Sequence, residues 1–143
     1  MISQNATFSG DVPQDSEFEH PPGAWLARYL AKEISAAGWQ PSEIDNWRDC
    51  GWSVVYSLKA AKLELTVAAM GSDGWALQVS AFDRPGMLRR FFGAKSSATE
   101  SDIFSLANVA HDVLEKSSCF TDIRWLADGL PDEKNSLPRP RNE

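Results

Sequence analysis

The stretch from Trp52 to Ala81 most limits what this chain can fold into, because apolar and small polar residues alternate along it. Every second residue is apolar in three successive runs: Trp52, Val54, Tyr56 and Leu58; Leu63, Leu65, Val67 and Ala69; Trp75, Leu77, Val79 and Ala81. A period of two places each run on one face of a β-strand. The links at 59–62 and 71–74 are short enough for hairpins. The sequence therefore predicts a three-stranded antiparallel meander with one apolar face.

Two helices are predicted on either side of this meander. Over 23–37, apolar residues recur at steps of three and four, and Gly38 supplies a left-handed stop. Over 99–116 the same spacing follows a segment, Ser97 to Glu100, with the spacing of a capping box. Residues 120–125 have the character of a short fourth strand or a docked extended segment. The predicted fold class is α+β, a two-layer sandwich of helix, three-stranded meander and helix.

The chain of 143 residues is long enough for one domain with a real core. We assign that domain to residues 23–126. Residues 1–22 are predicted to form an acidic arm without regular structure, in which Phe8, Val12 and Phe18 are spaced apolar anchors. Residues 127–143, polar and with three prolines, are predicted to be a disordered tail.

Charge limits the classes of partner. There are 14 basic and 20 acidic residues, a net charge of -6, which opposes attraction to nucleic acid or to anionic lipid. No apolar run approaches the roughly 20 residues that a membrane span needs, and the first residues lack the features of a signal peptide. We therefore expect a cytoplasmic protein with no nucleic-acid or membrane partner. Cys50 and Cys119 fit neither a zinc motif nor a disulfide framework.

Motifs for catalysis are not evident. No glycine-rich phosphate loop and no metal-binding motif occurs, so we expect no cofactor and no metal. His111 and Asp112 are adjacent on a predicted helix, where successive side chains diverge by about 100°, so the carboxylate cannot orient the histidine ring. We interpret the histidine as a surface residue. Glu43, Asp45 and Asp49 lie in a predicted loop. An active site assembled from such distant residues stays open as an alternative.

Several features favour contact with another protein. Segment 84–95 joins basic residues, among them Arg84, Arg89 and Arg90, to apolar ones, and fits either a docking loop or a crossover loop anchored in the core. The second face of the predicted sheet is small and nearly uncharged, which suits cover by the arm, a second copy, a flat partner or plain solvent. The remaining partner-binding candidates are the arm carboxylates and two loop tryptophans: Glu17, Glu19, Trp39 and Trp47.

In size, acidity and layout the chain resembles the small bacterial toxin-immunity proteins, which neutralise a toxin by covering its active site. Over 23–125 its order of elements is also similar to that of class I type III secretion chaperones. The first resemblance implies a non-enzymatic inhibitor whose carboxylates face a basic toxin. The second implies a homodimer that holds a segment of a secreted effector. We take the first as the leading hypothesis and the second as the alternative.

Overall fold

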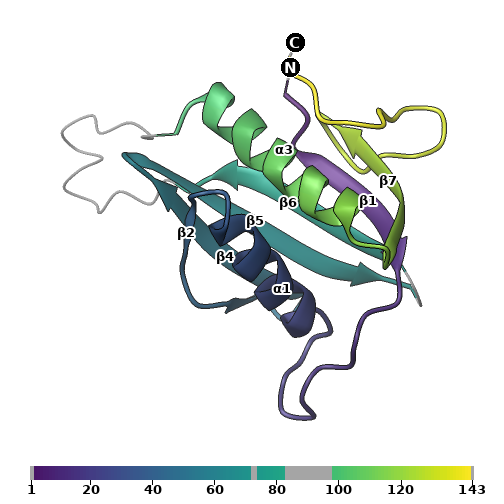
Figure 1. Cartoon of the computed structure of the whole chain (residues 1–143). Helices are drawn as coiled ribbons and strands as arrows, with labels where there is room; N and C mark the ends of the chain where they lie inside the picture. The colour runs from purple at the N-terminus through teal and green to yellow at the C-terminus, as the bar shows by residue number, and fades with distance from the viewer. Residues whose placement is uncertain (1, 72–73, 83–97, 143) are drawn as a thin grey trace.

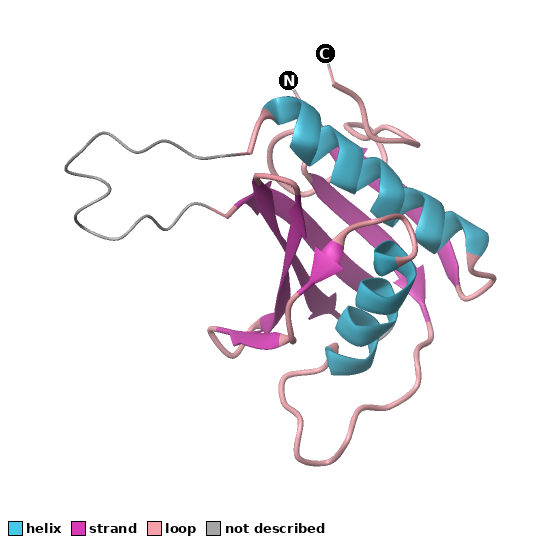
Figure 2. Ribbon diagram, turned by 60° about the vertical axis from the view of Figure 1, so that its left-hand side comes forward, coloured by secondary structure: helices cyan, strands magenta, loops and turns pink. Residues whose placement is uncertain are grey.

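The computed structural model of the chain describes residues 2–71, 74–82 and 98–142. Within these ranges it forms a seven-stranded sheet in which every pairing is antiparallel, with two helices packed on one face (Figures 1 and 2). The strands are β1 (Asn5–Gly10), β2 (Gln40–Pro41), β3 (Asp45–Trp47), β4 (Gly51–Leu58), β5 (Ala61–Met70), β6 (Gly74–Ala81) and β7 (Phe120–Leu126). The helices are α1 (Ala24–Ser35) and α3 (Glu100–Lys116). The spatial order is β2-β4-β5-β6-β1-β7, and β3 also pairs with β4.

The predicted sandwich of helix, three-stranded meander and helix is therefore wrong as a fold class. The meander itself forms as β4, β5 and β6, with Val54 opposite Leu65 and Leu65 opposite Val79. The sheet continues beyond it at both edges. Only the ends of the predicted apolar face, such as Leu58 and Ala81, are exposed.

Strand β1 is the largest departure from the prediction, because its residues were assigned to an arm without regular structure. It lies between β6 and β7, both of which come much later in the chain. Ala6 stands opposite Leu77 on one side and Trp125 on the other, and Phe8 stands opposite Trp75. Ala6 and Phe8 are buried, so this strand completes the core.

The C-terminal segment also differs from the predicted disordered tail. Leu137 forms a β-bridge with Trp125 on the outer edge of β7, and Asn142 forms one with Ile2. The Ser3 N–H donates to the Arg141 carbonyl at 2.8 Å. The described ends of the chain consequently lie side by side (Figure 1).

Both helices bury one apolar side against the sheet. Leu26, Leu30 and Ile34 of α1 are fully buried, and full burial of such a side chain contributes about 1.5–3 kcal/mol. Gly38 has the expected positive φ of 101° after α1. Helix α3 begins later than the capping-box spacing suggested. Its N-cap is Thr99. The Thr99 side chain accepts from the Asp102 backbone N–H, and the Asp102 carboxylate accepts from the Thr99 backbone N–H.

The opposite face of the sheet carries mostly small side chains, among them Thr7, Thr66, Ala76 and Ser80, and its charged residues include Glu64 and Arg124. Neither described helix covers it (Figure 2). Residues 11–22 make hydrogen bonds to one another, to α1, to β3 and to β4 near one end of the sheet, and Trp75 of β6 donates to Gly10 just before them. Residues 11–22 therefore do not cover this face.

Candidate functional site

The segment from residue 11 to residue 22, here called the arm loop, connects β1 to α1 and projects from one end of the sheet (Figure 1). Each end of the loop is held by an indole N–H from the sheet. Trp75 Nε1 donates to the Gly10 carbonyl at 3.1 Å, and Trp52 Nε1 donates to the Pro21 carbonyl at 2.7 Å. The two tryptophans that the alternation placed inward thus also position the loop.

Asp15 fixes the middle of the arm loop to the start of α1. Its Oδ2 accepts from the Gly23 and Ala24 N–H groups at 2.9 and 3.3 Å, and its Oδ1 accepts from the Trp25 N–H at 2.7 Å. The first N–H groups of a helix have no partner inside the helix, and a carboxylate there also meets the positive end of the helix dipole. Asp15 therefore caps α1 from eight residues upstream of Gly23, which itself makes no side-chain cap.

Glu19 and Arg28 form the second attachment of the arm loop to α1. Arg28 Nη1 donates to Glu19 Oε1 at 2.9 Å, and Nη2 pairs with Oε2. The hydrogen bond from Arg28 lowers the pKa of the Glu19 carboxyl, and the same bond raises the pKa of Arg28. The Glu19 carboxylate is therefore already paired within the chain.

Phe18 stands at the turn of the arm loop between these two attachments. The Glu19 N–H donates to the Ser16 carbonyl at 2.9 Å, which closes a turn over residues 16–19, and the Phe18 N–H donates to Ser16 Oγ at 3.3 Å. The Phe18 side chain is 86% exposed. The sequence predicted an apolar anchor here; that is wrong for Phe18, whereas Phe8 is buried.

The hairpin that joins β3 to β4 lies beside the base of the arm loop. Asn46 Nδ2 donates to the His20 carbonyl at 2.9 Å. Trp47 is half-buried, and the Arg48 guanidinium lies 5.6 Å from the centre of its ring. The cation-π contact uses one face of the indole within the hairpin.

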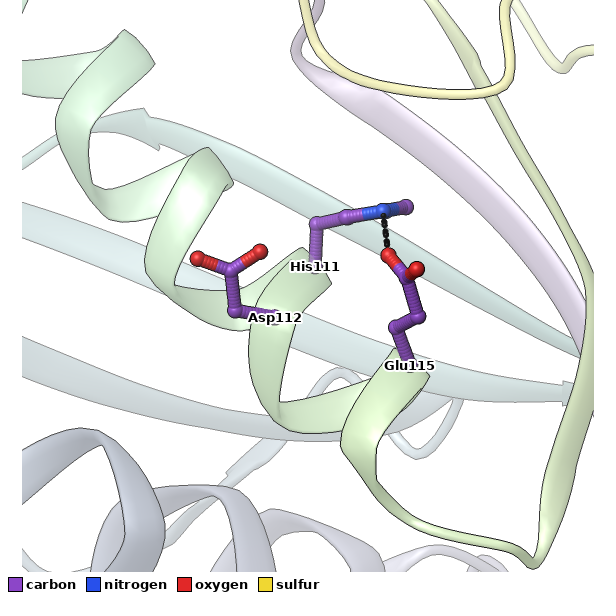
Figure 3. A group of neighbouring side chains, drawn as sticks. All are labelled: His111, Asp112 and Glu115. Carbon is purple, nitrogen blue, oxygen red and sulfur yellow. Dashed lines mark hydrogen bonds and ion pairs between the residues drawn. The ribbon is translucent and has the colours of Figure 1, made fainter.

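A second polar cluster, on α3, has the residue types of an active site (Figure 3). His111 is 3% exposed, so the prediction of a surface histidine is wrong. Trp125 Nε1 donates to His111 Nδ1 at 3.0 Å, and His111 Nε2 lies 2.7 Å from Glu115 Oε2. Arg139 then pairs with Glu115 at 3.3 Å and with Asp112 at 2.9 Å. Both ring nitrogens are therefore engaged inside the chain.

The same cluster has the residue types of a metal centre, and ligand atoms of His111, Asp112 and Glu115 lie within 4.8 Å of one another. A neutral histidine that binds metal through Nε2 keeps its proton on Nδ1 and donates it to an acceptor. Here Nδ1 faces the N–H of Trp125 and must itself accept, so the proton belongs on Nε2, toward Glu115. Arg139 adds a positive charge beside both carboxylates. The residues do not fit a metal.

The loop carboxylates considered for catalysis lie at the other edge of the sheet. Glu43 and Asp45 line an open groove of about 790 Å³ along β4, together with Arg48 and Glu64. Strands β6 and β1 lie between this groove and β7, against which the histidine packs. These acidic residues and His111 are not brought together.

The structure thus brings together some of the predicted partner-binding residues and separates others. Glu17 is exposed on the arm loop, Glu19 is paired with Arg28, and Trp47 lies on the neighbouring hairpin. Trp39 is only 3% exposed and packs in the core, so it is not available to a partner. Arg84, Arg89, Arg90 and the rest of segment 84–95 lie outside the described residues.

Comparison with known proteins adds no family to this description. No protein-family model matches the chain, and no curated protein matches it. Among the described residues, no helix is both long enough and apolar enough to cross a membrane. Function is therefore inferred from the arm loop and its contacts.

Proposed function

We propose that this chain is a non-enzymatic protein-binding protein, and specifically an inhibitor of the immunity type that acts on a toxin in the bacterial cytoplasm. The observation that carries the proposal is the arm loop. It holds an exposed aromatic side chain, Phe18, next to an exposed carboxylate, Glu17, on a backbone fixed at both ends. Aromatic side chains, phenylalanine among them, bury a large apolar area and are enriched at protein interfaces.

The charges of the arm loop support a basic partner. Four carboxylates occur between residues 11 and 19, with no lysine or arginine. Asp15 caps α1 and Glu19 pairs with Arg28, which leaves Asp11 and Glu17 for an incoming protein. Two carboxylates on the loop that carries the aromatic ring suit an active site lined with lysine or arginine, as in an enzyme that binds a polyanion. In the proposed mechanism the loop covers that site and blocks access of the substrate.

The test measures binding of the partner that the wild-type chain retains when its source cell is lysed. Glu17→Lys should slow association by about tenfold at low ionic strength, and by much less at high ionic strength, because steering by charge is screened. Glu133→Lys is the matched control, since it makes the same charge change on an exposed residue outside the loop. Equal association rates for the two variants would remove the electrostatic part of the proposal.

Light scattering on the purified chain separates this proposal from the secretion-chaperone alternative. A monomer that binds one folded toxin-like protein supports the immunity function. A stable homodimer that binds an unfolded effector segment would replace it with the chaperone function.

A further inference from the structure

We propose that Phe18 is the anchor of the partner contact, and that it enters an apolar pocket rimmed by lysine or arginine side chains on the partner. This inference rests on the proposed function, because it assumes that the arm loop binds another protein. It adds the residue that carries the affinity and the chemistry of the surface that receives it.

The exposure of Phe18 is unusual within the described residues. Leu130 at 56%, Met70 at 42% and Leu58 at 37% are the other large hydrophobic residues classed as exposed there, and Phe18 at 86% is well above them. An aromatic ring in water has a large apolar area to gain by burial. Its position at a turn, rather than on a sheet or helix, lets the whole ring enter a concave surface.

The loop holds this ring in a defined place before any partner arrives. The turn at 16–19 is closed by its own backbone. Asp15, just before the turn, accepts hydrogen bonds from the start of α1, and Glu19, just after Phe18, pairs with Arg28. A side chain presented by an ordered turn loses little backbone entropy on binding. Asp15 and Glu19 are accordingly positioning residues, and Phe18 and Glu17 are the residues that face the partner.

Within the residues that the structure describes, the groove between α1 and α3 is a poor receptor for the loop of a second copy. The described apolar groove between α1 and α3, about 610 Å³, is lined by Tyr29, Val109 and Val113. Its charged residues are Glu33, Asp112 and Lys116, two acids against one base, which would repel the acidic loop. The charge of the loop favours a pocket of opposite sign.

The experiment replaces Phe18 in the full chain with p-benzoylphenylalanine, which forms a covalent bond to a neighbour when illuminated. The same replacement at Leu130, which is also exposed, is the control. Cross-linking in the source cell, followed by mass spectrometry, gives the partner and the peptide that touches residue 18. We expect an adduct from position 18 and none from position 130, with lysine or arginine around the attachment point in the partner.

The captured partner is then purified, and its dissociation constant is measured against Phe18→Ala and Leu130→Ala. Loss of an interface anchor should weaken binding by about 30-fold or more, whereas Leu130→Ala should change it by less than about threefold. Thermal unfolding of both variants should match the wild type, because both side chains are exposed.

Three other outcomes would each overturn the inference in a distinguishable way. If the wild-type chain binds a partner and Phe18→Ala binds it equally well, the anchor is wrong and the proposed function stands. If the attachment point lies on an acidic or flat polar surface, the stated chemistry of the pocket is wrong. If neither capture nor cross-linking yields any partner, the proposed function fails together with the inference.

Discussion

The histidine cluster on α3 and the arm loop are built from similar polar residues but use them in opposite ways. In the cluster, Glu115 lies within hydrogen-bond distance of His111 and pairs with Arg139, and the histidine is buried against Trp125. In the arm loop, Asp15 and Glu19 bond to α1 and thereby leave Phe18 exposed. Residue types that suggest catalysis can thus be used within the chain, while a loop without any motif exposes an aromatic side chain.

The largest expected effect comes from breaking the buried histidine cluster. His111→Phe keeps an aromatic ring but leaves the buried N–H of Trp125 without its acceptor. A buried polar group without a partner costs about 1–3 kcal/mol, so the free energy of unfolding should fall by about that amount. Chemical denaturation monitored by tryptophan fluorescence measures it.

Tyr56→Phe is the matched control for that variant. The Tyr56 hydroxyl is buried and has no hydrogen-bond partner among the described residues, and burial raises its pKa. Its removal should leave the free energy of unfolding unchanged or slightly higher. If both substitutions cost the same, the bond between Trp125 and His111 is not what stabilises the cluster.

A smaller loss is expected when the arm loop is released from α1. Asp15→Ala removes the acceptor for three N–H groups at the start of the helix, and loss of a helix cap costs about 0.5–2 kcal/mol. The amides of Gly23, Ala24 and Trp25 should then exchange faster with solvent. Asp11→Ala, an exposed carboxylate on the same loop, should leave those amides unchanged. Faster exchange in both variants would contradict the specific role of Asp15.

The smallest effect is expected at the exposed pair of Glu19 and Arg28. Because Arg28 holds the pKa of Glu19 below its ordinary value of 4.5, the stabilising effect of the pair is present at neutral pH and is lost as the pH falls through that lowered pKa. A titration of the Glu19 carboxyl by NMR should show a midpoint below 4.5. Arg28→Gln should bring the midpoint back toward 4.5, and a wild-type midpoint at or above 4.5 would show that the pair does not form in solution.

The sequence predicted the parts of the fold that are encoded by local periodicity. Strands β4 to β6 follow from alternation over eight to ten residues each, and both helices follow from apolar steps of three and four. Strand β1 was missed because Ala6 and Phe8 provide only one repeat of the alternation. Its strand character comes from partners about 70 and 115 residues away, Leu77 and Phe120 among them. Strands β2 and β3 have two and three residues, too few for any period.

The candidate site was only partly predictable for a similar reason. Composition identified the acidic arm, but a carboxylate that caps a helix from eight residues upstream lies outside every local capping pattern. The pair of His111 and Glu115, in contrast, has the i, i+4 spacing of neighbours on a helix and could have been recognised from the sequence. Trp39 was misassigned because a tryptophan in a loop region gives no sign of which way its ring points.

The position of β1 has a consequence for how the protein is made in the cell. This strand leaves the ribosome before its neighbours β6 and β7, and its place between them is complete only after residue 126 has been added. At about 5–20 residues per second, β1 waits roughly 6 to 23 s for its second neighbour. During that interval its backbone remains open to wrong partners, so the synthesis of β7, rather than that of β1 itself, decides when the sheet is safe from aggregation.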